Sequence, residues 1–351
     1  MRSFLFSVFL SLFIFDATGQ IPPGYYDSAA GLYGLPLKVA LHNIIDDHTQ
    51  YDYSVVIDLF ETTDKKPNGK VWDIYSDIPG GTPPYEYSFT PSDQCGSYSQ
   101  EGDCYNREHT WPKSWFGGEV YPMYSDIFIL YPTDGFVNGQ RSNYPYGEVN
   151  SASWTSQNGS KRGNNSYPGY SGSVFEPIDE YKGDLARVYF YFSVRYYGED
   201  SGWPGSDMTT GAELKTWAYN MMYDWHTSDP VSQKEIDRND SIYQLQHNRN
   251  PFVDHPEWID SVWNPSDIEA ARAYRPEIVV FPNPAEGNIS ITCSETINAI
   301  RIYNSAGIMM MEDNIPGKSK LELDLTDLKC GVYFLHITTE NSSVCRKLLL
   351  F

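Results

Sequence analysis

Positively charged residues are scarce in this chain of 351 residues, which has 25 Lys and Arg against 46 Asp and Glu and a formal net charge of −21. Phosphate binding usually rests on clusters of Lys and Arg, so this balance counts against a broad basic groove for nucleic acid. After the N-terminus, no apolar run approaches the roughly 20 residues that cross a bilayer, which argues against stable membrane insertion. With 40% hydrophobic residues the chain can still bury a core, and its length predicts one large and one small domain.

The first 19 residues predict a secretory signal peptide. One basic residue, Arg2, precedes the apolar run from Phe4 to Phe15, and Ala17-Thr18-Gly19 supplies small residues for a cleavage site. The apolar run is too short to span a bilayer as a helix. We therefore expect a mature chain that begins at Gln20, passes through the periplasm, and ends in the extracellular space or at the cell surface.

Three residues suggest metal-assisted hydrolysis. Glu108 and His109 are adjacent, so on a strand they point to opposite faces, although a twist or bulge would let both converge on one ion and one water. A carboxylate is a hard ligand for a magnesium-type cation, and a neutral imidazole accepts a proton near neutral pH. Asn138 adds an amide oxygen. A carboxylate, an amide and waters leave room for a phosphate in an octahedral site, which predicts a phosphodiester substrate.

The motifs around these residues are long. They comprise Arg107-Glu108-His109, Trp111-Pro112-Lys113-Ser114-Trp115-Phe116, Asp126, Val137-Asn138-Gly139 and Arg141-Ser142-Asn143. Together they resemble the endonuclease I family of secreted bacterial nucleases, over about residues 25 to 262. The resemblance implies a ββα-metal (His-Me finger) motif, in which two strands and a helix surround one divalent ion. It also implies that His109 is the general base, Glu108 the first metal ligand and Asn138 the second, at the start of the motif's helix.

Two departures from the family pattern leave open which group steadies the phosphate. An arginine that some members carry in a glycine-rich loop has no counterpart between His109 and Asp126, and the usual Asp-Leu-His-Asn run reads Asp126-Ile127-Phe128-Ile129. A local basic patch within an acidic protein can still bind the scissile strand. The expected substrate contacts are Arg107, Lys113, Arg141 and Asn143, with Lys161 and Arg162 as further members of the patch.

The five cysteines favour disulfides in an exported protein. Cys95 and Cys104 flank a polar loop just before Glu108, so a bridge between them would stiffen the approach to the predicted site. The alternative is a zinc site formed by Cys95, Cys104 and His109, but its spacing fits no common structural pattern and it would consume the proposed base. The odd number in the tail, at Cys293, Cys330 and Cys345, leaves one thiol unpaired or intermolecular.

Periodicity and capping signals predict the helices of the body. Apolar residues at helical spacing follow Gly34-Leu35-Pro36, and capping boxes at Thr210/Glu213 and Ser232/Glu235 each predict a helix start. The aromatic run Leu185 to Tyr197 has the propensity of a strand, yet its spacing is also helical and the family resemblance favours a helix. Other expectations are a strand at Val71–Tyr75 and an exposed loop at Asn150–Ser173.

The sequence pattern changes after Pro265, where short predicted strands alternate with turns. This pattern predicts a small β-sandwich. The motifs here are Phe281-Pro282-Asn283-Pro284, Ile302-Tyr303-Asn304-Ser305-Ala306-Gly307, Leu328-Lys329-Cys330-Gly331-Val332-Tyr333-Phe334 and Arg346-Lys347-Leu348-Leu349. Together they resemble the sorting domain of type IX secretion. The resemblance implies the type IX machinery as a partner and often removal of the tail. The alternative is an ordinary carbohydrate-binding or adhesive β-module.

The sequence thus predicts an α+β protein, with a mixed nuclease domain containing a ββα-metal motif and a small all-β, Ig-like sandwich. We expect a signal peptide at 1–19, the nuclease domain at 20–265, a linker at 266–275 and the sorting domain at 276–351. The expected function is a monomeric, secreted endonuclease of low sequence specificity that uses Mg²⁺, or alternatively Ca²⁺ or Mn²⁺. The choice between DNA and RNA stays open. The competing hypotheses are an adhesin or glycan-binding protein and a catalytically inactive nucleic-acid binder.

Overall fold

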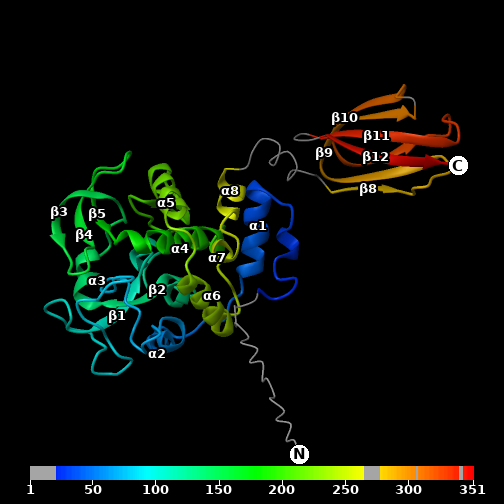
Figure 1. Cartoon of the computed structure of the whole chain (residues 1–351). Coiled ribbons are helices and arrows are strands. Elements are labelled where there is room, and N and C mark those ends of the chain that lie inside the picture. The colour runs from blue at the N-terminus through cyan, green and yellow to red at the C-terminus, as the bar shows by residue number, and fades with distance from the viewer. Residues whose placement is uncertain (1–20, 265–276, 306, 340–342) are drawn as a thin grey trace, which may run out of the picture. The chain divides into compact units, whose positions relative to one another are not determined.

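The computed structural model describes residues 21–264, 277–305, 307–339 and 343–351 (Figure 1). The predicted signal peptide and the predicted linker at 266–275 lie outside these residues. The chain divides into two compact units, the larger built on residues 39–259 and the smaller on residues 260–351 with residues 29–38. No helix within the described ranges is long and apolar enough to cross a membrane.

The N-terminal part of the chain, residues 21–264, mixes helices with small antiparallel sheets (Figure 1). Its helices are α1 (Gly34–Ile45), α2 (Tyr53–Thr63), α3 (Gly135–Arg141), α4 (Lys182–Arg195), α5 (Thr216–Ser228), α6 (Gln233–Gln246), α7 (Pro251–Asp254) and α8 (Trp258–Trp263). Its strands are β1 (Tyr105–His109), β2 (Leu130–Asp134), β3 (Val149–Thr155), β4 (Lys161–Asn165), β5 (Ser173–Glu176), β6 (Thr209–Thr210) and β7 (Glu213–Leu214). The pairs are β1 with β2 and β6 with β7, and β3, β4 and β5 form a third sheet in that order.

Helix α4 forms the core of this unit. Each of its 14 residues is buried, and its buried charges are paired, as in Arg187 with Glu235 and Lys182 with Glu176. Its aromatic side chains pack on those that follow the predicted base, and the rings of Phe192 and Trp111 lie 4.6 Å apart. The helical prediction for this run is confirmed, and its aromatic stripe is core.

Several local predictions meet different outcomes. Helix α1 begins at Gly34 as expected, and Ser232 and Glu235 form the predicted capping box of α6. The capping box at Thr210 is wrong, because Thr210 and Glu213 pair across a turn at Gly211 and α5 begins only at Thr216. The residues Asn150–Ser173 are not a loop but carry most of the β3–β4–β5 sheet, and Val71–Tyr75 forms only one bridge, between Val71 and Lys65.

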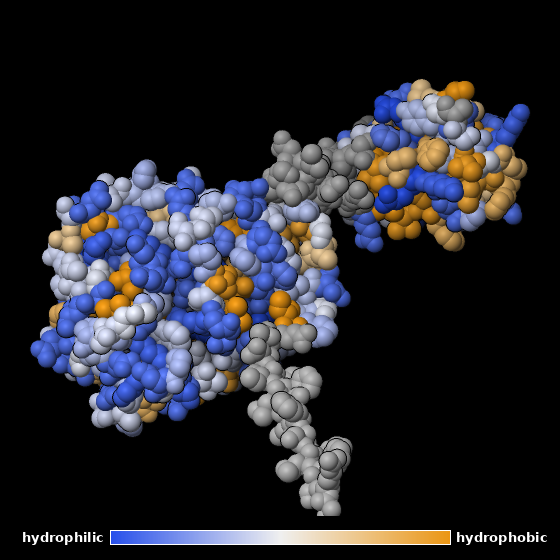
Figure 2. All heavy atoms as spheres, viewed as in Figure 1, coloured by the Kyte–Doolittle hydropathy of each residue, from blue (hydrophilic) through white to orange (hydrophobic). Residues whose placement is uncertain are grey.

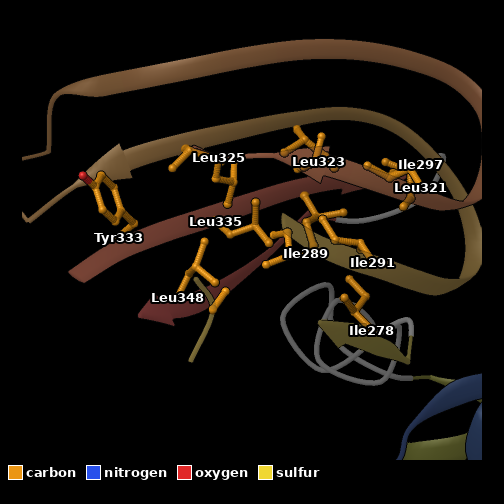
Figure 3. Close-up of a cluster of buried hydrophobic side chains, with 14 of the residues drawn as sticks. Ile278, Ile289, Ile291, Ile297, Leu321, Leu323, Leu325, Tyr333, Leu335 and Leu348 are labelled. Atoms are coloured by element: carbon orange, nitrogen blue, oxygen red, sulfur yellow. The ribbon is translucent and has the colours of Figure 1, made fainter. Parts of the chain in front are cut away.

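The part of the smaller unit from residue 277 on is all β, as predicted. Its strands are β8 (Ile278–Phe281), β9 (Asn288–Asn304), β10 (Met309–Asp324), β11 (Gly331–Thr339) and β12 (Ser343–Leu350). β9 pairs with β10 along one side, and on its other side it pairs first with β8 and then with β11. The long β9–β10 hairpin therefore joins β8 and β11 into one sheet. Apolar side chains gather between the strands (Figure 3).

The three cysteines of the smaller unit are all free. Cys293 is buried in its core, whereas Cys330 and Cys345 are exposed. Large apolar side chains also reach its surface, including Phe281 and Phe351, which are 71% and 72% exposed. The face of the larger unit that Figure 2 shows is mostly hydrophilic.

Candidate active site

Strands β1 and β2 and helix α3 form two strands followed by a helix, as the sequence predicts. The strands pair antiparallel without a register shift, with Glu108 opposite Tyr131 and His109 opposite Leu130. Asp134 ends β2 and caps α3, because its Oδ1 accepts a hydrogen bond from the backbone N–H of Val137 at 2.8 Å. The turn from strand to helix is therefore fixed by the residue that belongs to both.

The side chains of β1 alternate between two faces, as the regular pairing requires. Asn106 and Glu108 contact α3: the Nδ2 of Asn138 donates to the Oδ1 of Asn106 at 2.7 Å, and Glu108 pairs with Arg141. No bulge turns His109 toward this face. Glu108 thus lies on the face of β1 that contacts α3, the helix of the second predicted ligand Asn138, and the predicted base has different neighbours.

Glu108 is buried, with 2% of its surface exposed. The hydroxyl of Tyr75 donates to its Oε1 at 3.0 Å, and the Nη1 of Arg141 lies 3.0 Å from the same oxygen. Burial raises the pKa of Glu108 to about 7, against the lowering effects of the Arg141 charge and the Tyr75 hydrogen bond. Both contacts are made to Oε1, so neither of them occupies Oε2.

His109 is held by aromatic neighbours and by a backbone carbonyl. Its ring is stacked with Tyr53 and Tyr124, at centroid distances of 5.5 and 5.3 Å. Its Nε2 lies 3.0 Å from the carbonyl oxygen of Tyr124, and because a carbonyl only accepts, Nε2 must carry a hydrogen. Burial lowers the pKa of His109 to about 4. At neutral pH the ring is therefore neutral, and its Nδ1 is the nitrogen able to accept a proton.

Two of the predicted substrate contacts lie on the His109 side of β1. The Arg107 guanidinium lies over the Tyr53 ring at 4.1 Å, and its Nη1 donates to the Tyr53 carbonyl at 2.7 Å. Lys113 lies over the Tyr124 ring at 5.1 Å, and its Nζ pairs with Glu119 at 3.0 Å. The side chain of Lys113 is 45% exposed. Both cations thus stack on the two tyrosines that also contact the base.

The remaining members of the expected patch lie beyond α3. Asn143 is exposed just after the helix. Arg162 on β4 donates from its Nη1 to the Oε1 of Gln140 at 2.8 Å, and Lys161 pairs with Glu176 at 3.3 Å. Arg162 therefore contacts the motif's helix directly, whereas the charge of Lys161 is offset by a buried carboxylate.

The predicted substrate contact at Arg141 does not fit the structure. Arg141 is 1% exposed, and its guanidinium is occupied by Glu108 and by the carbonyls of His109 and Thr110. A phosphate cannot reach it in this position. The sequence prediction assumed that a charged residue faces solvent, whereas this one is buried beside an opposite charge.

Sequence reasoning missed four residues that contact the predicted site. Asn106 was detectable, because it precedes Glu108 by two positions and so lies on the same face of the strand. Tyr53 on α2, Tyr75 and Tyr124 come from separate segments, and no local pattern marks any of them. Only the tertiary fold brings these tyrosines to β1.

The predicted disulfide between Cys95 and Cys104 is present. The loop it closes places Tyr98 against α3, where two glycines make room for the ring. A Cβ at Gly135 would lie 2.6 Å from the Tyr98 ring, and one at Gly139 would lie 2.8 Å from its hydroxyl. The bridge and Tyr98 therefore clamp the helix that carries Asn138, and the alternative of a zinc site at these cysteines is not borne out.

We expect the double substitution Cys95→Ser with Cys104→Ser to destabilise the protein and slow turnover. Opening a loop of about ten residues costs about 2 to 3 kcal/mol of unfolding free energy, and a looser α3 places Asn138 less well. Denaturant unfolding and kcat measure the two effects. Cys330→Ser, at an exposed free thiol, serves as the control and should change neither. A serine pair with normal stability and kcat would contradict the clamp.

Asp73 supports α3 from a buried position. Its Oδ2 accepts from the backbone N–H of Asp134 at 2.9 Å, and its Oδ1 from that of Tyr75 at 2.8 Å. Burial raises its pKa from 3.8 to about 7. Because the folded state then holds the proton more tightly than the unfolded state, this group's contribution to stability is full below about pH 4 and is lost as the pH rises to about 7.

Asp73→Asn removes this titration, so the stability of the two proteins should depend differently on pH. Between pH 4 and pH 7 the wild type should lose up to about 4 kcal/mol relative to the variant, at about 1.4 kcal/mol for each pKa unit. Denaturant unfolding at both pH values measures the difference. A constant offset between the two proteins would show that Asp73 titrates normally.

The site offers ligands that suit a divalent cation. The carboxylate of Glu108 and the amide oxygen of Asn138 are hard oxygen donors, and the hydrogen bond from Asn138 Nδ2 to Asn106 leaves that oxygen unblocked. Within the part of the chain that the structure describes, one group of three metal-type ligands occurs elsewhere, at His42, Asp46 and Glu199. There the Arg195 guanidinium already bonds Asp46 and Glu199 at 2.9 and 2.6 Å, so that group is an ion-pair cluster.

A ββα motif with an acidic residue, a neutral histidine and an amide defines the class of metal-dependent nucleases of the ββα-metal type. Comparison with known proteins gives the family. The Endonuclease I family model matches residues 34–257, and a secretion system C-terminal sorting domain matches residues 279–350. The chain belongs to the Endonuclease I family, whose members generally use a divalent metal ion. It is a secreted or cell-surface nuclease with a type IX sorting domain.

The comparison also finds similar proteins that are named as nucleases. The chain is 38% identical over 253 residues to an extracellular ribonuclease of Bacillus amyloliquefaciens, a match that covers 68% of this chain and 78% of the relative. It is 35% identical over 254 residues to the extracellular ribonuclease of Bacillus subtilis, with the same coverage. A periplasmic deoxyribonuclease of Aeromonas hydrophila is 27% identical over 136 residues, which is 39% of this chain and 50% of the relative.

Proposed function

We propose that this protein is a Mg²⁺-dependent endonuclease that hydrolyses phosphodiester bonds in RNA and DNA with little sequence preference. The observation that carries the proposal is the β1–β2–α3 motif, which presents a buried carboxylate, a neutral histidine and an amide on adjacent elements. The alternative of an adhesin loses its basis, because the chain belongs to a nuclease family.

Each residue has a defined part in this mechanism. Glu108 and Asn138 would hold the ion, which when bound supplies charge stabilisation for the phosphate and the leaving oxygen. His109 accepts the proton of the attacking water at Nδ1, because its Nε2–H is committed to the Tyr124 carbonyl. Its aromatic neighbours keep the ring in one orientation, so the base is positioned before substrate binds.

Arg107, Lys113 and Asn143 would contact the nucleic acid. Lys113 is half exposed, and a phosphate can displace its surface partner Glu119 at little cost. Arg107 lies beside the base and is only partly buried. These cations supply the phosphate contacts that the missing family arginine would otherwise make. Because the protein offers few cations to the phosphates, we expect it to bind nucleic acid weakly and without dependence on base sequence.

The choice of polymer is supported by the relatives. The two named as ribonucleases match over 68% of this chain, which favours RNA as a substrate. The relative named as a deoxyribonuclease supports DNA as a second substrate. Mg²⁺ is proposed because the donor set is all oxygen and leaves several positions to water and phosphate.

The organisation proposed with this function has four parts. The signal peptide at 1–19 directs export, the nuclease domain spans 20–265, a linker spans 266–275, and the sorting domain spans 276–351. The protein would act as a monomer, since Glu108, His109 and Asn138 all lie on the compact β1–β2–α3 motif and the proposed site needs no second chain. The sorting domain would deliver it to the type IX machinery.

The test is cleavage of supercoiled plasmid and of a structured RNA by the mature protein from Gln20, with Mg²⁺ and with a chelator. Ion-dependent cleavage of both polymers is expected, with faster decay of the RNA. Folded, oxidised protein that cleaves neither polymer would contradict the proposal and favour an inactive nucleic-acid binder.

A further inference from the structure

Arg141 is a buried cation that links the two halves of the ββα motif. It is the last residue of α3, one helical turn after Asn138, and its guanidinium packs on the Tyr146 ring at 4.7 Å. Its Nη1 lies 3.0 Å from Glu108 Oε1 and donates to the His109 carbonyl at 2.8 Å, while its Nη2 donates to the Thr110 carbonyl. All three acceptors belong to β1 or follow it directly.

We propose that Arg141 is a positioning residue that ties the helix of Asn138 to the strand of Glu108 and His109, and so sets the spacing of the ion ligands. This inference rests on the proposed function of that site. It assigns Arg141 to the protein interior, in place of the substrate contact that its charge and sequence position predicted.

The shape of the guanidinium explains why an arginine is needed. Its donors form a rigid planar fork, and here two of its nitrogens reach one carboxylate oxygen and two consecutive carbonyls. A lysine ammonium is a single point on a flexible chain and cannot keep all three contacts. Arg141 also places a positive charge beside the buried Glu108 carboxylate.

A second group steadies the same carboxylate. Tyr75 donates to Glu108 Oε1, and its hydroxyl lies 2.8 Å from that of Tyr146, which stacks under Arg141. Arg141 and Tyr75 therefore hold one oxygen from two directions. These two contacts fix the orientation of the carboxylate and therefore the direction of its other oxygen.

The test is Arg141→Lys in the mature protein, with two readouts. In the absence of nucleic acid, Mn²⁺ binding measured by electron paramagnetic resonance should weaken about 10- to 100-fold, the usual cost of losing a group that orients a ligand. In the cleavage assay kcat should fall at fixed Mg²⁺, the KM for RNA should stay unchanged, and excess Mg²⁺ should restore part of the rate.

Two further variants separate positioning from stability. Arg249→Lys alters another buried arginine, which pairs with Asp254 and Asp240, and should lower the melting temperature without changing Mn²⁺ binding. Tyr75→Phe removes one hydroxyl from Glu108, and should weaken Mn²⁺ binding several-fold in a folded protein. If Arg141→Lys does not fold, the Mn²⁺ affinity of Tyr75→Phe decides whether the groups around Glu108 position the ion ligand.

Three outcomes would overturn the inference. A raised KM with unchanged Mn²⁺ affinity would make Arg141 a substrate contact. Normal Mn²⁺ affinity in both Arg141→Lys and Tyr75→Phe would leave only a structural role. A wild type that binds no Mn²⁺ would remove the ligand site itself. Failure of the proposed function is distinct, since it appears as wild-type protein that binds Mn²⁺ but cleaves no polymer.

Discussion

His109→Ala should lower kcat by about 10²- to 10⁴-fold, the usual contribution of a general base, while leaving Mn²⁺ binding intact. The base and the ion ligands contact different residues: His109 lies against Tyr53 and Tyr124, whereas Glu108 pairs with Arg141 and Asn138 bonds Asn106. Loss of the imidazole should therefore stop proton removal from water without disturbing the ion. Rates on a structured RNA at saturating Mg²⁺ measure the effect.

His255→Ala is the matched control. His255 also stacks on an aromatic ring, that of Trp258 at 4.1 Å, and pairs with Glu257, but it lies on α7's C-terminal side and has no part in the proposed site. Its turnover should equal that of the wild type. If His109→Ala retains a rate within tenfold of the wild type, another group must remove the proton.

Glu108→Gln should abolish both ion binding and turnover. The amide keeps the shape of the side chain but loses the negative charge, so we expect Mn²⁺ affinity and kcat each to fall by at least about 100-fold, beyond the usual cost of losing an outer partner. The variant also leaves the Arg141 charge buried without its counter-ion, which should lower the unfolding free energy by about 3 kcal/mol.

Glu235→Gln controls for that loss of stability. Glu235 is a buried carboxylate paired with the buried Arg187, through Nε at 2.5 Å and Nη2 at 2.8 Å, far from β1 in sequence. It should destabilise the fold to a similar degree but leave Mn²⁺ affinity unchanged. Equal ion affinity in wild type and Glu108→Gln would show that the ion is held elsewhere.

Together the two substitutions distinguish the base from the ligand. His109→Ala should bind the ion without turning over substrate, whereas Glu108→Gln should neither bind the ion nor turn over substrate. This difference tests the assignment of roles more strictly than the size of either effect, because general damage to the fold would reduce both readouts in both variants.

The ββα motif was predicted from a family resemblance whose residues are local. Strand β1, the cap at Asp134 and helix α3 lie within 37 residues, from Tyr105 to Arg141, so the elements of the motif are neighbours along the chain. The same applies to the disulfide, whose cysteines are nine positions apart. Short-range geometry thus determines the skeleton of the site.

The burial of individual side chains was not predictable in the same way. Arg141 and Glu108 are charged, and a sequence gives no sign that one will neutralise the other inside the protein. The stacking of His109 on Tyr53 and Tyr124 depends on how separate segments fold together. Propensity also failed for β4, which reads Lys161–Asn165 and is rich in polar residues, because pairing with β3 and β5 outweighs it.

The hairpin of β9 and β10 has a consequence for the C-terminal domain. Because β9 pairs with β8 near its start, with β11 near its end and with β10 on its other side, each of these strands depends on β9 for its pairing. Unfolding of β9 would therefore remove a partner from all three. The sorting domain should unfold in a single step, and a chain truncated within these strands should lose the whole sorting signal at once.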